Sequence, residues 1–485
     1  MNAAELINNL PDYTCDKDLT SLEIQQIEMD HRLLAECSMF ICIEGYTVDG
    51  HQYAEAAVQN GAAVIVAQKP VDVEVPVVLV PDTQRALALL ANSFYQHPSR
   101  QLKVIGVTGT NGKTSVTHII DEIHRYAKQR TAMIGTIQMT MDQEVYPVKN
   151  TTPDSLFLQK NLALMVEKDI DVMSMEVSSH ALDLGRVHGV DIDIAVFTNL
   201  SQDHLDYHQT MDKYLFAKSL LFAQLGNSLA EDRRKYAIIN SDDAHADFLM
   251  KATAQPIITY GVHHRSTFQA TDVELKANGV AFKMKTPAGD MMVESRLMGM
   301  FSVYNLLAAA AASYASGIDL VDIQAVFKQT SGVKGRFQPV EHQGDFGVII
   351  DYAHTPDSLE NVLTTIKKFC KGKIHVIVGC GGDRDRTKRP LMAHIACQYA
   401  DQAIFTSDNP RSESPEAILA DMVDGIAHEN YQVVSDREQA IQQAIQQAEE
   451  LDVILIAGKG HETYQIIGEE VLDFDDEQIA KKYLD

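Results

Sequence analysis

The sequence lacks several features that would place it in other classes of protein. No stretch approaches the roughly 20 consecutive apolar residues that a membrane-spanning helix needs. The first six residues, Met1 to Leu6, contain neither the basic segment nor the apolar segment of a secretion signal. Internal repeats, coiled-coil heptads and low-complexity tracts are also absent from the sequence. We therefore expect a cytoplasmic protein that does not insert into membranes.

Positive charge and paired cysteines are scarce as well. The 485 residues include 41 Lys+Arg against 67 Asp+Glu, a formal net charge of −26, and contain no long basic cluster. Nucleic acids and anionic membranes are polyanions that such a chain repels, so we expect neither as a partner. The six cysteines form no C-x-x-C pair and show no metal-ligand spacing. They are predicted to be reduced, partly buried thiols without a chemical role.

The most specific motif is a phosphate-binding loop. The apolar run 104–107 is followed by Thr-Gly-Thr-Asn-Gly-Lys-Thr at 108–114. A strand that ends in such a loop and continues as a helix directs backbone N–H groups toward one point, which suits a triphosphate. Lys113 would contact the β- and γ-phosphates, and the Thr114 hydroxyl would contact magnesium. Val107 replaces the first glycine of the general pattern. The alternative is a Gly-rich turn of an ordinary α/β domain.

The length of the chain suggests about three domains. Short apolar runs in the first hundred residues predict a small α/β domain; they are 39–43, 62–66 and 77–80. The periodicity is broken by His-Pro-Ser-Arg at 97–100 and by a Gly/Lys-rich segment at 330–335. The predicted domains are 1–98, 99–331 and 332–485.

Strands that alternate with helices are predicted in both larger regions. In the central region, two apolar runs end in polar residues; these are 171–176 and 192–197. Four similar runs follow in the last region, at 347–351, 374–379, 403–406 and 453–458. The pattern predicts an α/β fold with a P-loop ATPase-type parallel sheet in the centre and a Rossmann-like, doubly wound sheet at the C-terminal end. Because ligands bind at the carboxyl ends of parallel strands, the polar tails should converge with the phosphate loop.

Two of these tails contain candidate metal ligands. Glu176 could hold Mg²⁺ together with the phosphates, although a lone acid at a strand end is also typical of a cap or a surface charge. His204 and His208 have the i, i+4 spacing of helical zinc ligands. Leu205 stands where a zinc-protease motif has glutamate, and no third ligand is evident, so zinc is the weaker interpretation.

Three further features have both a functional and a structural explanation. Lys218 lies in an apolar helical stretch, where composition favours a surface lysine whose stem covers apolar residues. Residues 151–155, Thr-Thr-Pro-Asp-Ser, suit either a polar ligand or a helix N-cap. Arg186 could pair with an anionic substrate group, or it could be a surface arginine.

Three polar loops end strands of the last region. Residues 381–390 contain four cations and two acids after two glycines, and Asp-Asn-Pro-Arg at 408–411 ends the next strand. Paired arginines suit bidentate recognition of carboxylates. In the third loop, 458–462, Glu462 could hold a substrate ammonium group. The alternative for each is a solvated loop, but their common place at strand ends favours an amino-acid site.

Five ordered motifs resemble those of the Mur ligase family; they lie at 108–114, 151–154, 175–180, 199–206 and 351–356. The resemblance covers nearly the whole chain. It implies transfer of the ATP γ-phosphoryl group to a carboxylate, followed by attack of an amine on the acyl phosphate. The implied small-molecule substrates are ATP, UDP-N-acetylmuramoyl-L-alanyl-D-glutamate and meso-diaminopimelate. Two Mg²⁺ ions are the implied cofactors, and we expect a monomer.

The resemblance also assigns the nucleotide and metal sites. The implied ATP contacts are Gly109, Thr110, Asn111, Gly112, Lys113, Thr114, Asn305, Arg336 and Asp351. His354 would lie close to the same site. One magnesium would bind Thr114 and Glu176, and the second would bind His204 and a carbamylated Lys218, which is N6-carboxylysine. Lys113, Glu176, His204 and Lys218 are the implied catalytic residues.

The remaining family positions would bind the other two substrates. The UDP-sugar-peptide contacts implied are His31, Tyr46, Thr47, Val48, Asn150, Thr151, Thr152, Ser178 and Arg186. His31 stands where the family usually has serine, and Leu184 where some members have glutamine. The amino-acid contacts implied are Arg384, Asp408, Asn409, Pro410, Arg411, Gly458 and Glu462.

Two arginines favour diaminopimelate over lysine. Arg384 and Arg411 could bind its second carboxylate, whereas the bare ammonium end of lysine would be repelled. The alternatives are a lysine-adding muramyl-peptide ligase, a folylpolyglutamate synthase-type ligase, and a catalytically silent nucleotide-binding regulator. The Arg411 loop argues against the other ligases, and the complete set of implied catalytic residues argues against the regulator.

Overall fold

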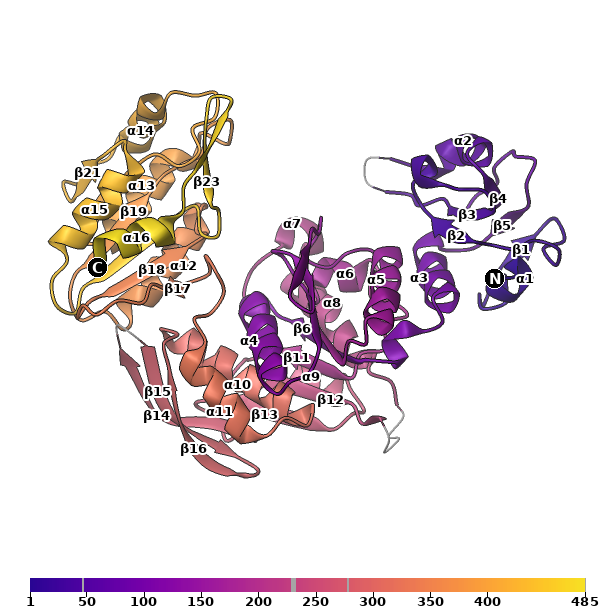
Figure 1. Ribbon diagram of the computed structural model, residues 1–485, viewed down its shortest axis with the longest axis horizontal. Helices are drawn as coiled ribbons and strands as arrows, with labels where there is room; N and C mark the ends of the chain where they lie inside the picture. Colours follow the sequence, from indigo (N-terminus) through magenta and orange to yellow (C-terminus); the bar gives the residue numbers. More distant parts are fainter. Residues whose placement is uncertain (46–47, 228–232, 277–278, 485) are drawn as a thin grey trace. The chain divides into compact units, whose positions relative to one another are not determined.

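The computed structural model describes residues 1–45, 48–227, 233–276 and 279–484. Figure 1 shows the helices and strands of the chain with their labels. The chain divides into two compact units. The first contains residues 1–260 and 311–318, and the second contains residues 261–310 and 319–485.

The first unit begins with a small sheet whose strand order is β1-β5-β4-β3-β2. Its strands are β1 (Thr14–Cys15), β2 (Gln26–Glu28), β3 (Ser38–Ile41), β4 (Ala62–Ala67) and β5 (Val77–Leu79). All neighbours except β1 and β5 pair in parallel. The accompanying helices are α1 (Ala3–Ile7), α2 (Ala54–Gln59) and α3 (Thr83–Phe94). The predicted small α/β arrangement is confirmed.

A larger sheet follows in the same unit, with the order β13-β12-β11-β6-β10-β7-β8-β9. Its strands are β6 (Lys103–Thr108), β7 (Thr131–Ile134), β8 (Met139–Met141), β9 (Glu144–Tyr146), β10 (Val172–Glu176), β11 (Ile194–Phe197), β12 (Tyr236–Asn240) and β13 (Ile257–Gly261). Only β8 and β9 run antiparallel to their neighbours. Because β6 pairs with both β10 and β11, the predicted convergence of the three strand ends is confirmed.

Six helices accompany this sheet within the described residues. They are α4 (Lys113–Tyr126), α5 (Ser155–Glu167), α6 (Ser179–Asp183), α7 (Leu205–His208), α8 (Met211–Ala223) and α9 (Ala246–Lys251). Every residue of β10 and β11 is buried, which explains why these strands read as nearly continuous apolar runs.

The second unit begins with an antiparallel meander that the sequence analysis did not predict. It consists of β14 (Phe268–Lys276), β15 (Gly279–Thr286) and β16 (Gly289–Ser295). Helices α10 (Met300–Ala315) and α11 (Leu320–Gln329) follow, and residues 311–315 of α10 belong to the first unit. Phe282 and Met284 are buried on β15, whereas Lys283 between them is only partly buried. Such alternation is typical of a sheet with one covered face.

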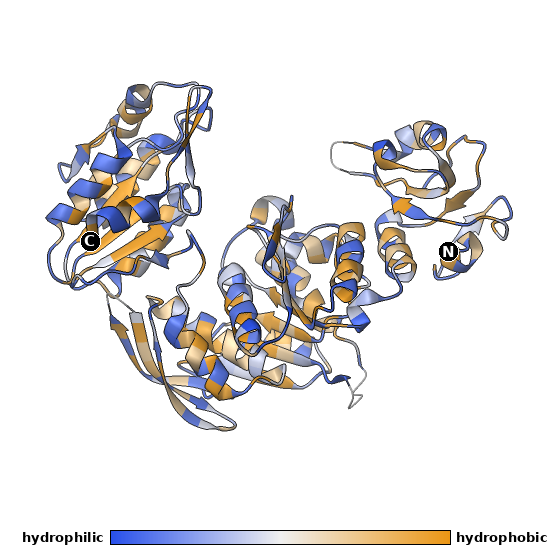
Figure 2. Cartoon of the chain, in the orientation of Figure 1, coloured by the Kyte–Doolittle hydropathy of each residue, from blue (hydrophilic) through white to orange (hydrophobic). Residues whose placement is uncertain are grey.

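The C-terminal sheet has the order β17-β18-β22-β19-β20-β21, and only β17 is antiparallel. Its strands are β17 (Gln338–Pro339), β18 (Gly347–Asp351), β19 (Ile374–Val378), β20 (Gln402–Phe405), β21 (Tyr431–Val433) and β22 (Val453–Ala457). A separate hairpin pairs β23 (Tyr464–Ile467) with β24 (Glu470–Asp473). Figure 2 shows hydrophobic residues concentrated on the strands of the six-stranded sheet.

Helices cover both faces of this sheet. One apolar cluster joins Ile349 and Leu455 to helices α12 (Pro356–Lys367), α13 (Lys388–Tyr399) and α14 (Pro415–Val423). The other joins Ile350 and Ile456 to α15 (Arg437–Gln447) and α16 (Asp476–Leu484). Successive residues of a strand point to opposite faces, so these two clusters lie on opposite sides. The predicted doubly wound α/β fold is confirmed.

Two predicted absences can be compared with the described residues. No helix among them is both long enough and apolar enough to cross a membrane. All six cysteines lie within the described ranges, and each is a free thiol. Cys42, Cys380 and Cys397 are buried, whereas Cys37 is exposed.

A buried ion pair joins the two helices on one face of the C-terminal sheet. Arg437 and Asp476 are both fully buried, with Nε to Oδ1 and Nη2 to Oδ2 distances of 2.8 Å. Arg437 Nη2 also donates to the carbonyl of Ala457 at the end of β22, at 3.0 Å. The pair therefore ties α15, α16 and β22 together.

We expect Asp476→Ala to lower the free energy of unfolding by about 3–5 kcal/mol, because it leaves the buried Arg437 charge without a partner. Urea unfolding followed by circular dichroism measures the change. The matched control is Lys482→Ala, which breaks the exposed Lys482–Glu438 pair between the same two helices and should have little effect. Equal effects of the two substitutions would contradict the prediction.

Candidate active site

The phosphate loop requires glycine at Gly109. Its φ is +148°, and a Cβ added there would lie 1.8 Å from Thr198 Oγ1 on the tail of β11. Gly112, with φ +88°, precedes the first residue of α4. The loop therefore leads directly into the N-terminus of a 14-residue helix, where the helix dipole favours a bound anion.

The tail of β11 holds the phosphate loop in place. Thr110 N donates to Asn199 O at 2.8 Å, and Asn111 N donates to Asn199 Oδ1 at 3.0 Å. Thr198 Oγ1 donates to Asn111 O at 2.6 Å, and Ser201 N donates to Thr110 Oγ1 at 3.0 Å. The loop conformation thus depends on residues about 90 positions later in the sequence.

Two lysines meet at one carbonyl of the loop. Lys113 Nζ donates to Gly109 O at 2.9 Å and to Thr110 O at 2.9 Å, while Lys218 Nζ donates to Gly109 O at 2.7 Å. Lys218 is only 1% exposed, and its Nζ lies 4.5 Å from the centre of the Tyr214 ring. The interpretation of Lys218 as a surface lysine is therefore wrong, because its helix turns this position toward the loop.

Burial shifts the pKa values of Lys218 and Tyr214. Burial first, and then the positive charge of Lys113, hold the pKa of Lys218 well below its usual range, although Asp203 opposes the shift. Burial raises the pKa of Tyr214 to about 12, and its hydroxyl lies 3.2 Å from Thr110 Oγ1. Lys218 is thus disposed to be a neutral amine beside the phosphate loop.

Glu176 ends β10 next to the phosphate-loop strand. It pairs in register with Val107 and is only 1% exposed, so it is not a surface charge. Its Oε1 accepts from Thr136 N at 2.8 Å, and its Oε2 accepts from Thr136 Oγ1 at 3.1 Å. A Cβ added to Gly135 would approach Oε1 to 2.5 Å. These contacts fix the carboxylate and leave lone pairs for a cation.

The histidines of the β11 tail belong to a ring cluster. The ring of His180 lies 4.9 Å from that of His204 and 5.4 Å from that of His208. His204 is exposed, whereas His208 is buried, with Nε2 2.9 Å from Ser179 Oγ. Among the described residues, no group of three or more His, Cys, Asp or Glu side chains is placed to hold a metal ion. The structure thus gives the zinc interpretation no support. A magnesium ion needs fewer protein ligands when phosphates complete its shell.

Four residues of the implied sugar-peptide site gather around Glu176. Thr152 Oγ1 donates to Glu176 O at 2.9 Å and accepts from Ser178 N at 3.0 Å. Arg186 Nη1 donates to Thr152 O at 3.1 Å, and Thr151 Oγ1 lies 3.1 Å from Thr136 Oγ1.

The N-cap interpretation of the same loop is confirmed. Asp154 accepts from Phe157 N at 2.9 Å and caps α5. The capping function thus belongs to Asp154, while the preceding threonines contact the end of β10. Asn150 is exposed.

The other implied sugar-nucleotide residues lie on the small N-terminal sheet and its loops. The His31 ring stacks on Tyr53 with a centroid distance of 4.5 Å and an interplanar angle of 8°. Val48 is 53% exposed. Tyr46 and Thr47 lie outside the described residues.

The implied nucleotide contacts of the second unit include a buried acid. Asp351 ends β18 and accepts from Phe337 N at 2.7 Å. Burial raises its pKa to about 6, opposed by that hydrogen bond and by Arg336. The Arg336 guanidinium lies 5.4 Å from the Tyr352 ring centre, and His354 Nδ1 lies 2.8 Å from Tyr352 O. Asn305 is largely buried on α10, at 8% exposure.

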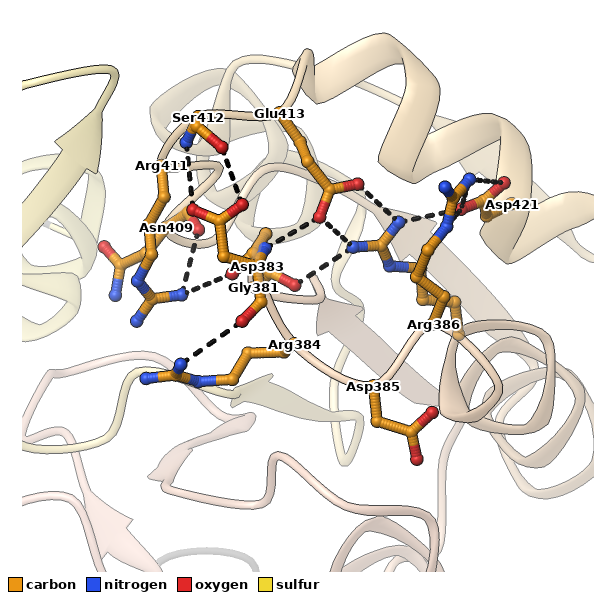
Figure 3. Close-up of polar contacts among 12 residues, drawn as sticks. Gly381, Asp383, Arg384, Asp385, Arg386, Asn409, Arg411, Ser412, Glu413 and Asp421 are labelled. Carbon is orange, nitrogen blue, oxygen red and sulfur yellow. Dashed lines mark hydrogen bonds and ion pairs between the residues drawn. The ribbon is translucent and has the colours of Figure 1, made fainter.

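The three polar loops of the C-terminal sheet come together as expected. Arg411 Nη1 donates to Gly382 O at 2.8 Å (Figure 3). A Cβ added to Gly381 would lie 2.9 Å from Arg411 Nη1 and 3.8 Å from Arg384 Cγ. The side chains of Arg384 and Arg411 therefore both lie beside Gly381. Pro410, which directly precedes Arg411, is buried.

Glu462 is held by two neighbours in the same cluster. Asn409 Nδ2 donates to Glu462 Oε2 at 2.8 Å, and Lys459 Nζ lies 3.2 Å from both Glu462 Oε2 and Asn409 Oδ1. A Cβ added to Gly458 would lie 2.8 Å from Asp408 Oδ2. Sequence reasoning missed the fully buried Lys459, whose signal was a lysine between two glycines at a strand end.

The 408–411 loop is also fastened to the β23–β24 hairpin. Arg411 N donates to Ile466 O at 3.0 Å, and Gly468 N donates to Arg411 O at 2.7 Å. Ile466 N donates to Asn409 Oδ1 at 3.0 Å. Backbone contacts to the hairpin therefore hold Arg411, whose φ is +52°.

The phosphate loop at the end of β6, with two lysines and a fixed glutamate beside it, defines a P-loop nucleotide-binding protein. Three family models match it: "Mur ligase family, catalytic domain" at residues 23–95, "Mur ligase middle domain" at 107–313, and "Mur ligase, glutamate ligase domain" at 335–460. The chain belongs to the Mur ligase family.

Several known proteins are similar along nearly the whole chain. A UDP-N-acetylmuramoyl-L-alanyl-D-glutamate–2,6-diaminopimelate ligase of Bacillus cereus is 56% identical over 95% of this chain and 94% of its own length. The protein of the same name from Oceanobacillus iheyensis is 53% identical over 99% and 98%. A solved structure with that name is 35% identical, with a TM-score of 0.76 over 99% of this chain and 98% of its own.

The similarity to a more distant solved structure shows only that the fold is shared. It is the UDP-N-acetylmuramoylalanyl-D-glutamyl-2,6-diaminopimelate–D-alanyl-D-alanyl ligase from Acinetobacter baumannii, at 21% identity and a TM-score of 0.61 over 95% of each chain.

We expect Gly109→Ala to weaken nucleotide binding by about 10-fold or more, because the added Cβ overlaps Thr198 Oγ1 and displaces the loop. Isothermal titration with ADP measures the affinity. The control is Gly226→Ala, because Gly226 also has a positive φ but no atom within 4 Å of an added Cβ. Unchanged ADP affinity in the Gly109 variant would show that the loop tolerates the side chain.

Proposed function

We propose that this chain is an ATP-dependent amide ligase that adds meso-diaminopimelate to UDP-N-acetylmuramoyl-L-alanyl-D-glutamate in peptidoglycan precursor synthesis. The observation that carries this proposal is the loop cluster that brings Arg384 and Arg411 together and holds Glu462 nearby. Guanidinium groups suit a carboxylate and a fixed glutamate suits an ammonium. Diaminopimelate has a carboxylate and an ammonium group at its distal end. The names of the similar proteins include 2,6-diaminopimelate.

The reaction uses the groups around the phosphate loop for positioning and charge neutralisation. The loop amides and Lys113 hold the ATP phosphates while the γ-phosphoryl group passes to the D-glutamate carboxylate. The amine of diaminopimelate then attacks the acyl carbon, and inorganic phosphate leaves. Thr151, Thr152, Ser178 and Arg186 would orient the acceptor substrate, since they surround the end of β10.

Two magnesium ions fit the polar groups present. Thr114 and Glu176 would hold the first, and the buried, fixed carboxylate of Glu176 supports this assignment. His204 and a carbamylated Lys218 would hold the second. Magnesium would supply positive charge that neutralises the phosphate oxygens.

The environment of Lys218 supports its carbamylation. Carbon dioxide adds to a neutral amine, forming an N–C bond and releasing one proton, and the depressed pKa of Lys218 favours the neutral form. The product replaces a cation with an anionic oxygen ligand. The position of Lys218 beside Gly109 would bring that ligand to the phosphate site.

Residues of the second unit and of the first unit are proposed to contact the two nucleotides. Asn305, Arg336 and Asp351, with His354 nearby, would contact the nucleotide from the second unit, while His31, Val48 and Asn150 would contact the sugar nucleotide. We propose the domain division 1–98, 99–331 and 332–485 and a monomeric, cytoplasmic enzyme. The proposed substrates are small molecules: ATP, the UDP-linked dipeptide and meso-diaminopimelate.

The amino-acid substrate can be tested directly. We expect phosphate release from ATP and the UDP-linked dipeptide with meso-diaminopimelate but not with L-lysine. Arg411→Ala should lower kcat/KM for diaminopimelate by about 10- to 100-fold through loss of charge-assisted hydrogen bonds, with the KM for ATP unchanged. Turnover with lysine, or equal loss of both substrates, would contradict the assignment.

Lys218→Ala should abolish phosphate release without loss of folding, since it removes the carbamate ligand. Formate or acetate should restore part of the activity by entering the vacated space. Lys213→Ala is the control, because Lys213 lies on the same helix but is exposed, and its ammonium group donates to Gln209 Oε1 at 2.7 Å. Full activity of Lys218→Ala without added carboxylate would refute the role of the carbamate.

A further inference from the structure

The two arginine-bearing loops meet backbone to backbone. Gly382 N donates to Asn409 O at 2.9 Å. A Cβ added to Gly382 would lie 1.8 Å from Pro410 O, so no side chain fits between the loops. The spacing of Arg384 and Arg411 therefore depends on how closely these two backbones are held.

One carboxylate spans the junction of these loops. Glu413 lies just beyond the 408–411 loop, and its Oε1 accepts from Asp383 N at 2.7 Å and from Arg389 Nη2 at 2.8 Å. Its Oε2 accepts from Arg389 Nη1 at 3.0 Å. Arg389, at the end of the first loop, is 0% exposed and also donates to Gly381 O at 3.4 Å. Glu413 thus joins both ends of one loop to the other (Figure 3).

A second carboxylate makes the reciprocal contact. Asp383 accepts from Ser412 Oγ at 2.6 Å and from Ser412 N at 3.3 Å. Asp383 and Arg411 both have left-handed backbones, with φ of +55° and +52°. Such conformations are unfavourable for residues with side chains and persist only where surrounding contacts impose them. The Asp383–Ser412 contact lies next to both strained positions.

The charge of the spanning carboxylate is stable over the working pH range. The hydrogen bonds from Arg389, and then from Asp383 N, hold the pKa of Glu413 at about 2. Glu413 is therefore ionised at any pH at which the enzyme would be assayed, and its contacts do not switch off with moderate acidification.

We infer that Glu413 and Asp383 are positioning residues that set the spacing of Arg384 and Arg411 and thereby the selectivity for an amino acid with a second, distal carboxylate. The inference rests on the proposed function. Both carboxylates are engaged by protein partners, since Glu413 binds Arg389 and main chain, while Asp383 binds Ser412. Their effect passes through the two guanidinium groups, whose binding of a carboxylate depends on separation and angle.

Asp421 offers a matched control for Glu413. Its carboxylate accepts from the same Arg389, at 2.7 Å, and from Arg386 at 2.8 Å. Within the described part of the chain, the Asp421 carboxylate forms no hydrogen bond with residues 408–412 or 381–384. Asp421→Asn therefore removes a charge from Arg389 while the junction of the loops keeps its carboxylates.

The test is a steady-state comparison of Glu413→Gln and Asp421→Asn. Glu413→Gln should raise the KM for meso-diaminopimelate about 10-fold, because one charge-assisted contact set is lost. Its KM for ATP and for the UDP-linked substrate should stay within about twofold of wild type, a split that general loss of folded enzyme does not produce. Asp421→Asn should leave all three KM values unchanged.

A second pair of variants tests Asp383 while allowing for misfolding. Asp383→Asn keeps an acceptor for Ser412 and tolerates the left-handed backbone, so it should retain near-wild-type KM for diaminopimelate. Asp383→Ala and Ser412→Ala should each raise that KM, and the double variant should be no worse than Asp383→Ala alone. Additive effects of the two substitutions would overturn the inferred contact.

The outcomes separate this inference from the proposed function. If wild-type enzyme fails to use diaminopimelate, the proposed function fails. If wild type uses it but Glu413→Gln behaves like Asp421→Asn, the positioning inference alone is overturned. A uniform fall in kcat with all KM values unchanged in Glu413→Gln would also overturn it, since that result indicates a structural role.

Discussion

The candidate active site depends on the position of β6 between β10 and β11. Parallel pairing on both sides forces the three strand ends to the same edge of the sheet. The phosphate loop, Glu176 and the Asn199 tail are then neighbours although they are far apart in the sequence. The tight fit of Gly109 against Thr198 completes the arrangement, because any side chain at that position would separate the loop from the tail.

The C-terminal loops follow the same principle with different chemistry. They also end parallel strands, but charged side chains and not a helix N-terminus line the amino-acid site proposed there. Protein carboxylates occupy much of this cluster. They bind either the neighbouring loop or one of the buried cations, Arg389 and Lys459. Within the described residues, the guanidinium groups of Arg384 and Arg411 form hydrogen bonds with main-chain oxygens only.

The sequence was sufficient to predict the buried parallel strands that carry the polar loops, such as β6, β10 and β11, because these strands produce apolar runs that glycines and polar residues interrupt. Composition alone favoured a surface position for Lys218, since its contact with Gly109 joins residues 109 positions apart and no local pattern indicates it; only the family resemblance assigned it to the site. The β14–β16 meander was also missed, because strands with one covered face have few apolar residues. The contacts of Glu413 and Asp383 likewise arise only when the loops meet.

The fastening of residue 411 by its main chain has an evolutionary consequence. Both hydrogen bonds that attach it to the β23–β24 hairpin use backbone atoms, which every residue except proline can supply. Residues that tolerate the left-handed backbone at this position, such as asparagine or glycine, can therefore replace Arg411 while the loop stays in place. Under the proposed function, a change in the amino-acid substrate would need substitutions at the tip of the 408–411 loop and not a different domain.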